Sequence, residues 1–285
     1  MRIDAHIHFW MPSCGFDNRP VADHEAYRRD FLPATVADDL DAARIDGVIL
    51  VQTCPQVAET QWLLRLAERD DRIVGVTGWV DLDADACDFA PLLAQRKIVG
   101  IRAQLRRVAD SAFVRRPRVI RNLAAALEKG LALTILAEER HHEHVLAILS
   151  QLPAGPITVN HLGLPFPEVD RARWRDHLGR YTQRADVYLQ FSGLPFLFGE
   201  HWRSAHAQSI LDDAFGIFGS QRLMFASDWP MLVRFASYVE WVRAVEALMD
   251  RRNLSAKERD AIFAGNALRA HPRLRSGAHV SASDN

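Results

Sequence analysis

Two histidines, His6 and His8, stand two positions apart near the start of the chain. The residues around them are typical of a β-strand, and side chains at positions i and i+2 of a strand point to the same face. Both imidazoles would therefore leave the end of this strand together. Such a pair can bind a metal ion or hold a water molecule for reaction, although a histidine pair of this kind also occurs for structural reasons alone.

Two more candidates for chemistry follow apolar runs later in the chain. Asp228 comes directly after Leu223–Ser227 and before a Trp-Pro pair, and His161 ends a second apolar run that begins at Ile157. We expect both side chains at the carboxyl ends of strands, where a parallel barrel keeps its catalytic groups. The alternative for Asp228 is a role as the cap of a following helix.

The elements that must position these residues alternate regularly along the sequence. Eight β-rich runs are predicted as strands: Arg2–His8, Gly47–Gln52, Ile73–Trp79, Val99–Arg102, Leu131–Leu136, Ile157–His161, Val187–Ser192 and Leu223–Ser227. Amphipathic stretches between them predict helices: Thr35–Ile45, Ala58–Arg69, Arg118–Glu128, His142–Gln151 and Ala205–Ile217. Strands joined by connections of helix length indicate parallel crossovers.

Eight such units in 285 residues predict an α/β fold, a single (β/α)₈ TIM barrel over residues 1–274. A disordered tail is expected at 275–285, and a helix that begins with a Ser255–Glu258 capping box precedes it. The long stretch Gly15–Asp30 is a candidate active-site loop. When the barrel closes, the last strand lies beside the first, so Asp228 should come close to His6 and His8.

Composition excludes several classes of function. Lys and Arg together number 35 and Asp and Glu 36, so the net charge of −1 gives no reason to expect a nucleic acid or an acidic membrane as partner. The 3 cysteines form no CxxC pair and no disulfide framework. We expect a soluble, cytoplasmic protein that acts on a small molecule, and a homodimer is compatible with the sequence. The other arginines between 106 and 121 are interpreted as a solvated surface.

Several motifs, taken together and in order, resemble those of one enzyme family. They are the opening run MRIDAHIHFW, Gly100-Ile101-Arg102, Asn160-His161-Leu162-Gly163, Phe191-Ser192-Gly193-Leu194, Phe225-Ala226-Ser227-Asp228-Trp229-Pro230 and the closing Gly265-Asn266-Ala267. This set resembles the amidohydrolase superfamily. The resemblance is greatest to its amidohydrolase-related branch, which includes sugar lactonases such as L-fuconolactonase and L-rhamnonolactonase, and 2-pyrone-4,6-dicarboxylate lactonase.

The resemblance implies a role for each candidate. Asp228 matches the aspartate that takes a proton from the attacking water and returns it to the leaving oxygen. His6, His8 and His161 match histidines that polarise the carbonyl or, with Asp228, hold one divalent metal such as Zn²⁺ or Mn²⁺. Catalysis without a metal is equally compatible with this branch, because a lactone is an activated ester.

Substrate-binding roles are implied for five further residues. Arg102 matches a position that contacts the acyl or carboxylate end of the substrate in lactonases, and Gln104 would share its face. Gln190 stands where related lactonases carry lysine, and its neutral amide is expected to donate a hydrogen bond. Trp10 and Trp229, beside strand ends, are candidate aromatic walls for a sugar ring or a pyrone.

The sequence also departs from the two-metal members of the superfamily. These members use a bridging lysine or glutamate after strand four and another histidine after strand five. Here the corresponding segments read Arg102-Ala103-Gln104 and Leu136-Ala137-Glu138, and the histidines at 141, 142 and 144 fall on the following helix. A binuclear site is therefore not expected.

The sequence predicts a hydrolase that opens a lactone ring with water activated by Asp228. One alternative is a metal-dependent decarboxylase of an unsaturated or aromatic acid on the same scaffold. A second alternative is a barrel without catalytic activity that binds a metabolite.

Overall fold

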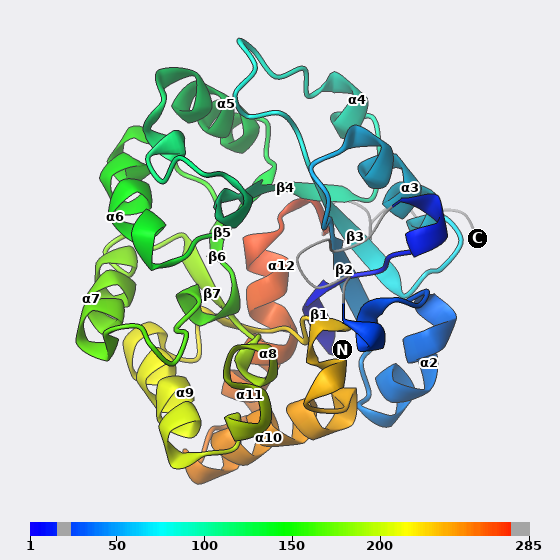
Figure 1. Cartoon of the computed structure of the whole chain (residues 1–285), viewed down its shortest axis with the longest axis vertical. Helices are drawn as coiled ribbons and strands as arrows, with labels where there is room; N and C mark the ends of the chain where they lie inside the picture. The colour runs from blue at the N-terminus through cyan, green and yellow to red at the C-terminus, as the bar shows by residue number, and fades with distance from the viewer. Residues whose placement is uncertain (16–23, 275–285) are drawn as a thin grey trace.

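The computed structural model describes residues 1–15 and 24–274, and eight parallel strands form a single ring of neighbours in chain order (Figure 1). The strands are β1 (Ile3–Ile7), β2 (Gly47–Val51), β3 (Ile73–Gly78), β4 (Ile98–Gln104), β5 (Ala132–Leu136), β6 (Ile157–Val159), β7 (Val187–Phe191) and β8 (Leu223–Phe225). The predicted (β/α)₈ fold is therefore confirmed.

Helices surround the ring of strands (Figure 1). They are α2 (Pro33–Ala42), α3 (Val57–Ala67), α4 (Ala90–Leu93), α5 (Pro117–Glu128), α6 (Glu139–Ile148), α7 (Arg171–Tyr181), α8 (Leu194–Phe198), α9 (Ala205–Phe218), α10 (Tyr238–Arg251), α11 (Ala256–Asp260) and α12 (Asn266–Ala270). Short 3₁₀ turns are η1 (Pro12–Cys14), η2 (Glu25–Tyr27), η3 (Leu105–Arg107), η4 (Phe113–Arg115), η5 (Leu149–Gln151), η6 (His161–Gly163), η7 (Gly199–His201) and η8 (Met231–Arg234), and η9 (Ala261–Gly265) is a π-helical turn.

Most element boundaries lie within a few residues of those predicted, and two differences affect the site. Strand β6 ends at Val159, so His161 lies in the turn that follows rather than in the strand, and β8 ends at Phe225, before its predicted end at Ser227. The Ser255–Glu258 capping box is confirmed at the start of α11. Residues 16–23 of the predicted active-site loop and the predicted tail 275–285 lie outside the described residues.

The barrel closes where its first strand meets the segment after its last. The backbone N–H of Asp228 donates to the carbonyl of His6 at 2.9 Å, and the N–H of His8 donates to the carbonyl of Trp229 at 2.7 Å. Below this point, the buried carboxylate of Asp4 accepts hydrogen bonds from the N–H of Ser227 and the hydroxyl of Tyr238, both at 2.9 Å. These bonds fix the position of β1 relative to the segment that follows β8.

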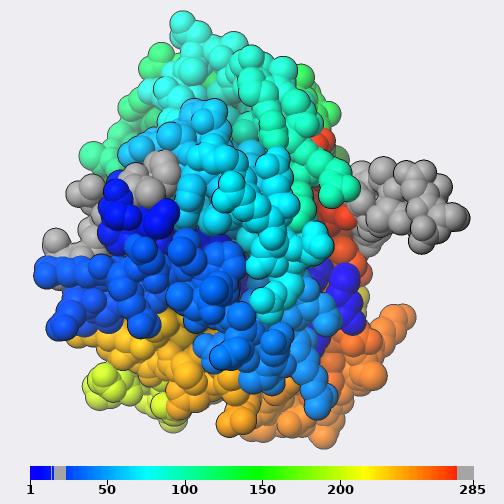
Figure 2. Space-filling view, turned by 90° about the vertical axis from the view of Figure 1, so that its right-hand side faces the viewer, coloured from blue at the N-terminus to red at the C-terminus, as the bar shows by residue number. Residues whose placement is uncertain are grey.

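The outer layer closes at the same place. Arg2 at the start of β1 donates to Glu246 of α10 at 2.9 Å and to the carbonyl of Ala43 after α2 at 2.9 Å. Helices α2 and α10 consequently pack side by side, and the surface of the early helices (blue) adjoins that of the late chain (gold to orange) in Figure 2. The seam between first and last units is thus bonded in both layers.

The apolar core has two parts. The main part fills the space between strands and helices, and a smaller cluster joins Ile3, Ile49 and Met224 of the barrel to the alanines of α12. Helix α12 lies across the centre of the ring in Figure 1, so it covers one end of the barrel and leaves the carboxyl ends of the strands open at the other. Within the described residues, no helix has the length and apolar character needed to cross a membrane.

Candidate active site

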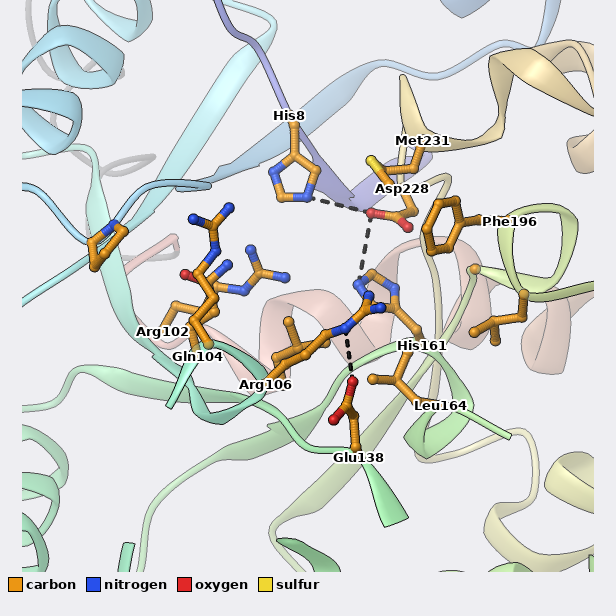
Figure 3. Close-up of a pocket in the computed structure, with 15 residues that line it drawn as sticks. His8, Arg102, Gln104, Arg106, Glu138, His161, Leu164, Phe196, Asp228 and Met231 are labelled. Atoms are coloured by element: carbon orange, nitrogen blue, oxygen red, sulfur yellow. Dashed lines mark ion pairs between the residues drawn. The ribbon is translucent and has the colours of Figure 1, made fainter. Parts of the chain in front are cut away.

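Three imidazoles converge on one carboxylate oxygen at the carboxyl end of the barrel. The Oδ1 atom of Asp228 lies 3.3 Å from Nε2 of His8, 3.6 Å from Nε2 of His161 and 3.8 Å from Nε2 of His6. His8, His161 and Asp228 line a cavity of about 580 Å³, and Figure 3 shows their side chains pointing toward one another there. Closure of the barrel therefore does bring Asp228 beside His6 and His8.

The partners of His8 and His6 fix where their protons lie. Nδ1 of His8 is 2.5 Å from the carbonyl oxygen of Val51, which can only accept, so Nδ1 carries the hydrogen. Nδ1 of His6 is 2.8 Å from Oε1 of Gln190, whose own Nε2 donates to the carbonyl of Ala5 at 3.1 Å. His6 must therefore also carry its hydrogen on Nδ1, which leaves the Nε2 lone pairs of both rings facing Asp228.

Burial keeps these imidazoles neutral. It lowers the pKa of His6 well below its ordinary value, helped by the nearby His8 and His161. It lowers the pKa of His161 to about 4, and the pKa of His8 also falls, although the Asp228 carboxylate opposes this. The Nε2 atoms of these two neutral rings, His6 and His8, each carry a lone pair and lie only 3.0 Å apart. Such an arrangement of acceptors is stable when a cation lies between them.

The Asp228 carboxylate remains ionised at neutral pH. Burial by itself raises its pKa, but the neighbouring His161, His8 and Arg102 more than offset this, and the net pKa lies below the ordinary value. The Oδ1 atom has no hydrogen-bond partner of normal geometry in the described part of the chain. A buried, ionised oxygen without a hydrogen bond is costly, so the site suits a bound cation or a water molecule at this atom.

His161 reaches the site on a left-handed turn. The φ angles of His161, Leu162, Gly163 and Leu164 are 47°, 57°, 73° and 53°. Two side chains of the outer helices, Trp174 and His142, hold this turn. The indole N–H of Trp174 in α7 donates to the carbonyl of Leu162 at 2.7 Å.

His142 contacts the same turn from α6. Its Nε2 is 2.9 Å from the carbonyl of Gly163, and its Nδ1 is 3.1 Å from the hydroxyl of Tyr181. The carbonyl can only accept, so His142 donates through Nε2 and accepts from Tyr181 through Nδ1. As the sequence predicted, the histidines after strand five lie on the helix and do not line the cavity. No feature of the sequence indicates that one of them supports His161.

The segment after β7 packs directly against His161. The hydroxyl of Ser192 is 2.9 Å from Nδ1 of His161 and can donate or accept, so the ring can carry its proton on either nitrogen. Gly193 follows with a φ of 82°, and a Cβ there would lie 2.8 Å from Cβ of His161. Only a glycine fits this close approach.

Arg102 and Gln104, at the end of β4, line the cavity as predicted substrate contacts would. Nη1 of Arg102 donates to the carbonyl of Gln52 at 2.8 Å, and Nε2 of Gln104 donates to the carbonyl of Thr53 at 3.1 Å. The buried carboxylate of Glu59 accepts from the N–H of Thr53 at 2.9 Å and so holds this loop. Burial lowers the pKa of Arg102 to about 10, and the guanidinium remains charged at neutral pH.

Three of the predicted substrate contacts lie elsewhere. Gln190 is buried beneath His6, where it bonds that ring and also accepts from the amide of Asn160. Trp10 packs against Phe31 and Trp229 packs against Phe9 and Phe31, and neither tryptophan is among the residues that line the cavity. Both tryptophans therefore pack among aromatic side chains and do not form a face of the cavity.

The cavity has two walls of different character (Figure 3). Arg102, Gln104 and Arg106 project from β4 and η3 on one side, and Leu164, Phe196 and Met231 lie on the other. Arg107 and Glu138 complete the polar side. The arginines at 106 and 107, which the sequence predicts on a solvated surface, are partly exposed and line this cavity. The continuation of β4 to Gln104, two residues past its predicted end, directs η3 over the cavity.

Comparison with known proteins gives the family. The family model described as amidohydrolase matches residues 3–273. The chain belongs to the amidohydrolase family. It is 34% identical over 292 aligned positions to an L-fucono-1,5-lactonase of Burkholderia multivorans (strain ATCC 17616 / 249), which covers 95% of this chain and 96% of the relative. An L-fucono-1,5-lactonase of Burkholderia ambifaria is 31% identical, with 93% of each protein covered.

A solved structure agrees with these sequence matches. The structure of an amidohydrolase from Burkholderia multivorans with bound zinc is 34% identical in sequence to this chain and superposes on it with a TM-score of 0.82. The match covers 95% of this chain and 98% of the other. In this chain, ligand atoms of His6, His161 and Asp228 all lie within 4.8 Å of one another and are buried. These three residues could hold a metal, and Nε2 of His8 faces the same point.

Proposed function

We propose that this amidohydrolase hydrolyses a lactone, opening the ring of a sugar-acid lactone or of a related pyrone. The observation that carries the proposal is the ionised Asp228 oxygen among three neutral imidazoles, inside a cavity that also presents the Arg102 guanidinium. The similarity to two L-fucono-1,5-lactonases supports the same reaction class.

The residues of the cavity are suited to the two proton transfers of the reaction. Asp228 takes a proton from the water whose oxygen attacks the ring carbonyl, and it later delivers that proton to the ring oxygen as the carbon–oxygen bond breaks. Arg102 donates to the carbonyl oxygen as negative charge develops there. His161 can also donate from Nε2 when its Nδ1 accepts from the hydroxyl of Ser192.

We also propose that the site binds one divalent metal, Zn²⁺ or Mn²⁺. The two imidazoles at His6 and His8 present lone pairs 3.0 Å apart, and His161 and Asp228 complete a set of nitrogen and oxygen donors that Zn²⁺ accepts. When bound, the metal would supply Lewis acidity to the substrate carbonyl or lower the pKa of a bound water. Catalysis without the metal stays an alternative that the experiment below decides.

The test is a hydrolysis assay on a panel of sugar lactones and pyrone carboxylates, followed by the fall in pH. We expect turnover by the wild-type chain, and a loss of about 10²–10⁴-fold in kcat for Asp228→Asn, with an unchanged circular dichroism spectrum. Parallel assays after treatment with a chelator and after return of Zn²⁺ or Mn²⁺ measure the metal requirement. Wild-type kcat in Asp228→Asn would contradict the proposal.

Two other functions predict different results in the same assay. A decarboxylase would release CO₂ from an aromatic or unsaturated acid, lose this activity on chelation and leave every lactone intact. A barrel that only binds a metabolite would turn over none of the compounds. No observation in the described structure favours either alternative over hydrolysis.

A further inference from the structure

Two backbone carbonyls in the turn between β2 and α3, residues 52–56, hold side chains of the cavity. The carbonyl of Gln52 accepts from Nη1 of Arg102 at 2.8 Å, and the carbonyl of Thr53 accepts from Nε2 of Gln104 at 3.1 Å. Arg102 and Gln104 lie on the same side of the cavity in Figure 3. The position of this turn therefore decides where the guanidinium and the amide lie.

A buried carboxylate of α3 binds the same turn. Oε1 of Glu59 accepts from the backbone N–H of Thr53 at 2.9 Å and from its hydroxyl at 2.8 Å, and Oε2 accepts from the backbone N–H of Cys54 at 2.5 Å. Both oxygens thus accept from donors, as an ionised carboxylate does. Glu59 is fully buried and is not among the residues that line the cavity.

These contacts meet in two successive peptide groups. A peptide group is planar, with its N–H and its carbonyl on opposite sides. The N–H of Thr53 and the carbonyl of Gln52 belong to one such group, so Glu59 binds one side of it and Arg102 the other. In the next group, the N–H of Cys54 binds Glu59 and the carbonyl of Thr53 binds Gln104. Each carboxylate oxygen therefore orients one peptide that holds one side chain of the cavity.

The carbonyl that holds His8 is fixed in another way. It belongs to Val51, the last residue of β2, and the N–H of the same peptide group, that of Gln52, donates to the carbonyl of Thr77 in β3 at 3.1 Å. Pairing between strands, and not Glu59, orients this peptide. Loss of the Glu59 carboxylate should therefore displace Arg102 and Gln104 and leave His8 in place.

Arg102 depends on this support. Its side chain is buried, and its Nε has no hydrogen-bond partner among residues 1–15 and 24–274. Burial lowers the pKa of Arg102 to about 10, and the negative charges of Asp228 and Glu59 oppose that decrease. Glu59 thus acts on Arg102 twice, through the peptide that it orients and through its charge.

We propose that Glu59 is a positioning residue, whose two carboxylate oxygens fix the two peptide groups that direct Arg102 and Gln104 toward the substrate. For its effect on rate, the proposal rests on the lactonase function above, in which Arg102 donates to the carbonyl oxygen as charge develops there. The positioning itself is measurable without a substrate.

NMR of the ¹⁵N-labelled protein without substrate tests the positioning. The Nε–H signal of Arg102 is identified by its loss in Arg102→Lys, and the imidazole signals of His8 by their loss in His8→Gln. In Glu59→Gln, the new NH₂ group would face a peptide N–H, so we expect the Arg102 signal to shift or broaden while the His8 signals stay in place. An unchanged Arg102 signal would overturn the proposal, and so would an equal displacement of His8.

Lactone kinetics test the consequence for rate. Glu59→Gln should lower kcat by about 10–10²-fold, as expected when a group that acts in the transition state is misplaced, and kcat should decrease more than KM increases. In the background of Arg102→Gln, the same substitution should lower kcat much less, because the two residues act together. Full additivity would overturn the proposal. If no lactone is turned over, the lactonase function fails and the NMR result alone decides the positioning.

Two further variants separate positioning from stability. Asp186→Asn is the control, because this carboxylate also accepts from a backbone N–H, that of Gly155 at 2.7 Å, but before β7 at the opposite end of the barrel. It should lower the free energy of unfolding without changing kcat or the Arg102 signal. Glu59→Asp keeps the charge with a shorter reach and should recover part of both properties. If Glu59→Gln fails to fold, wild-type kcat and an unchanged Arg102 signal in Glu59→Asp would overturn the proposal.

Discussion

At the scale of single residues, the site is held together by groups that do not face the cavity. Gln190 and the carbonyl of Val51 each fix one ring proton, and through these contacts the lone pairs of His6 and His8 face Asp228. Gln190 was predicted from the sequence to contact substrate. Its side chain points into the barrel and contacts His6 and Asn160 below the cavity. How far below the cavity a strand residue lies depends on the whole barrel, so no local sequence pattern reveals it.

Gly193→Ala tests the most crowded of these contacts. The new Cβ would lie 2.8 Å from Cβ of His161, at a φ of 82° that only glycine adopts without strain. We expect the free energy of unfolding to fall by about 1–3 kcal/mol and kcat to fall with it, because His161 must move. Urea denaturation and lactone kinetics measure the two effects.

Gly216→Ala is the matched control for that substitution. Gly216 lies exposed in α9, and nothing stands within 4 Å of a Cβ placed there. The same change should raise the free energy of unfolding by up to about 1 kcal/mol, since alanine favours the helix. If Gly193→Ala kept both the stability and the kcat of the wild type, the close packing between Gly193 and His161 would be needed neither for stability nor for activity.

At the scale of elements, the outer helices do more than cover the strands. Helices α6 and α7 each send one hydrogen-bond donor to the turn that carries His161. Neither donor can be assigned from the sequence, because the turn that it supports cannot be predicted. This turn has four consecutive left-handed residues, and only one of them is a glycine. The sequence does predict most strands and helices, but a left-handed path of Leu162 and Leu164 is not one that their residue types favour.

Trp174→Phe tests this support. Phenylalanine keeps most of the packing but removes the N–H that donates to the carbonyl of Leu162 at 2.7 Å, and an unpaired buried carbonyl costs about 1–3 kcal/mol. We expect kcat to decrease more than KM increases, because His161 loses its position while the walls of the cavity remain.

Trp202→Phe provides the comparison for Trp174→Phe. It also breaks a bond from an indole N–H to a carbonyl, that of Phe235 at 3.1 Å, but at a distance from the His161 turn. We expect a similar loss of stability with a smaller change in kcat. An equal decrease of kcat in both variants would show that the bond to Leu162 acts only through overall stability.

At the scale of the whole molecule, the order of the elements was predictable and so was the meeting of the chain ends. Eight strand and helix units of regular spacing predict closure, and closure alone places Asp228 beside His6 and His8. The arginines that line one side of the cavity were not predictable in this way. Arg106 and Arg107 have the composition of a solvated face, and only the direction of η3 after β4 turns them over the cavity.

Stability should depend on pH through two buried histidines that do not line the cavity. Burial lowers the pKa of His142 and of His271 to about 4 from an ordinary value of 6.5. Each of these two histidines therefore binds more protons in the unfolded chain than in the folded one between these pH values, so its contribution to stability is complete above about pH 6.5 and is lost as the pH falls toward about 4.

His271→Leu should flatten this dependence. Between pH 6.5 and 4, the slope of the unfolding free energy against pH should decrease by up to about 1.4 kcal/mol per pH unit, the contribution of one titrating group. Urea denaturation at several pH values in the presence of a chelator measures the slope, and exposed His206→Leu is the control. A slope that is identical in His271→Leu and the wild type would contradict this assignment.

The bonds between His6 and Asp228 and between His8 and Trp229 join β1 to the segment after β8, and these two segments leave the ribosome at very different times. The paired imidazoles are translated long before the acid they surround. A nascent chain that still lacks β8 also lacks the carboxylate that we propose as the base, however well its earlier units have folded. We therefore expect a chain cut before β8 to be inactive, and to recover activity only when the missing segment is supplied as a separate peptide that docks against β1.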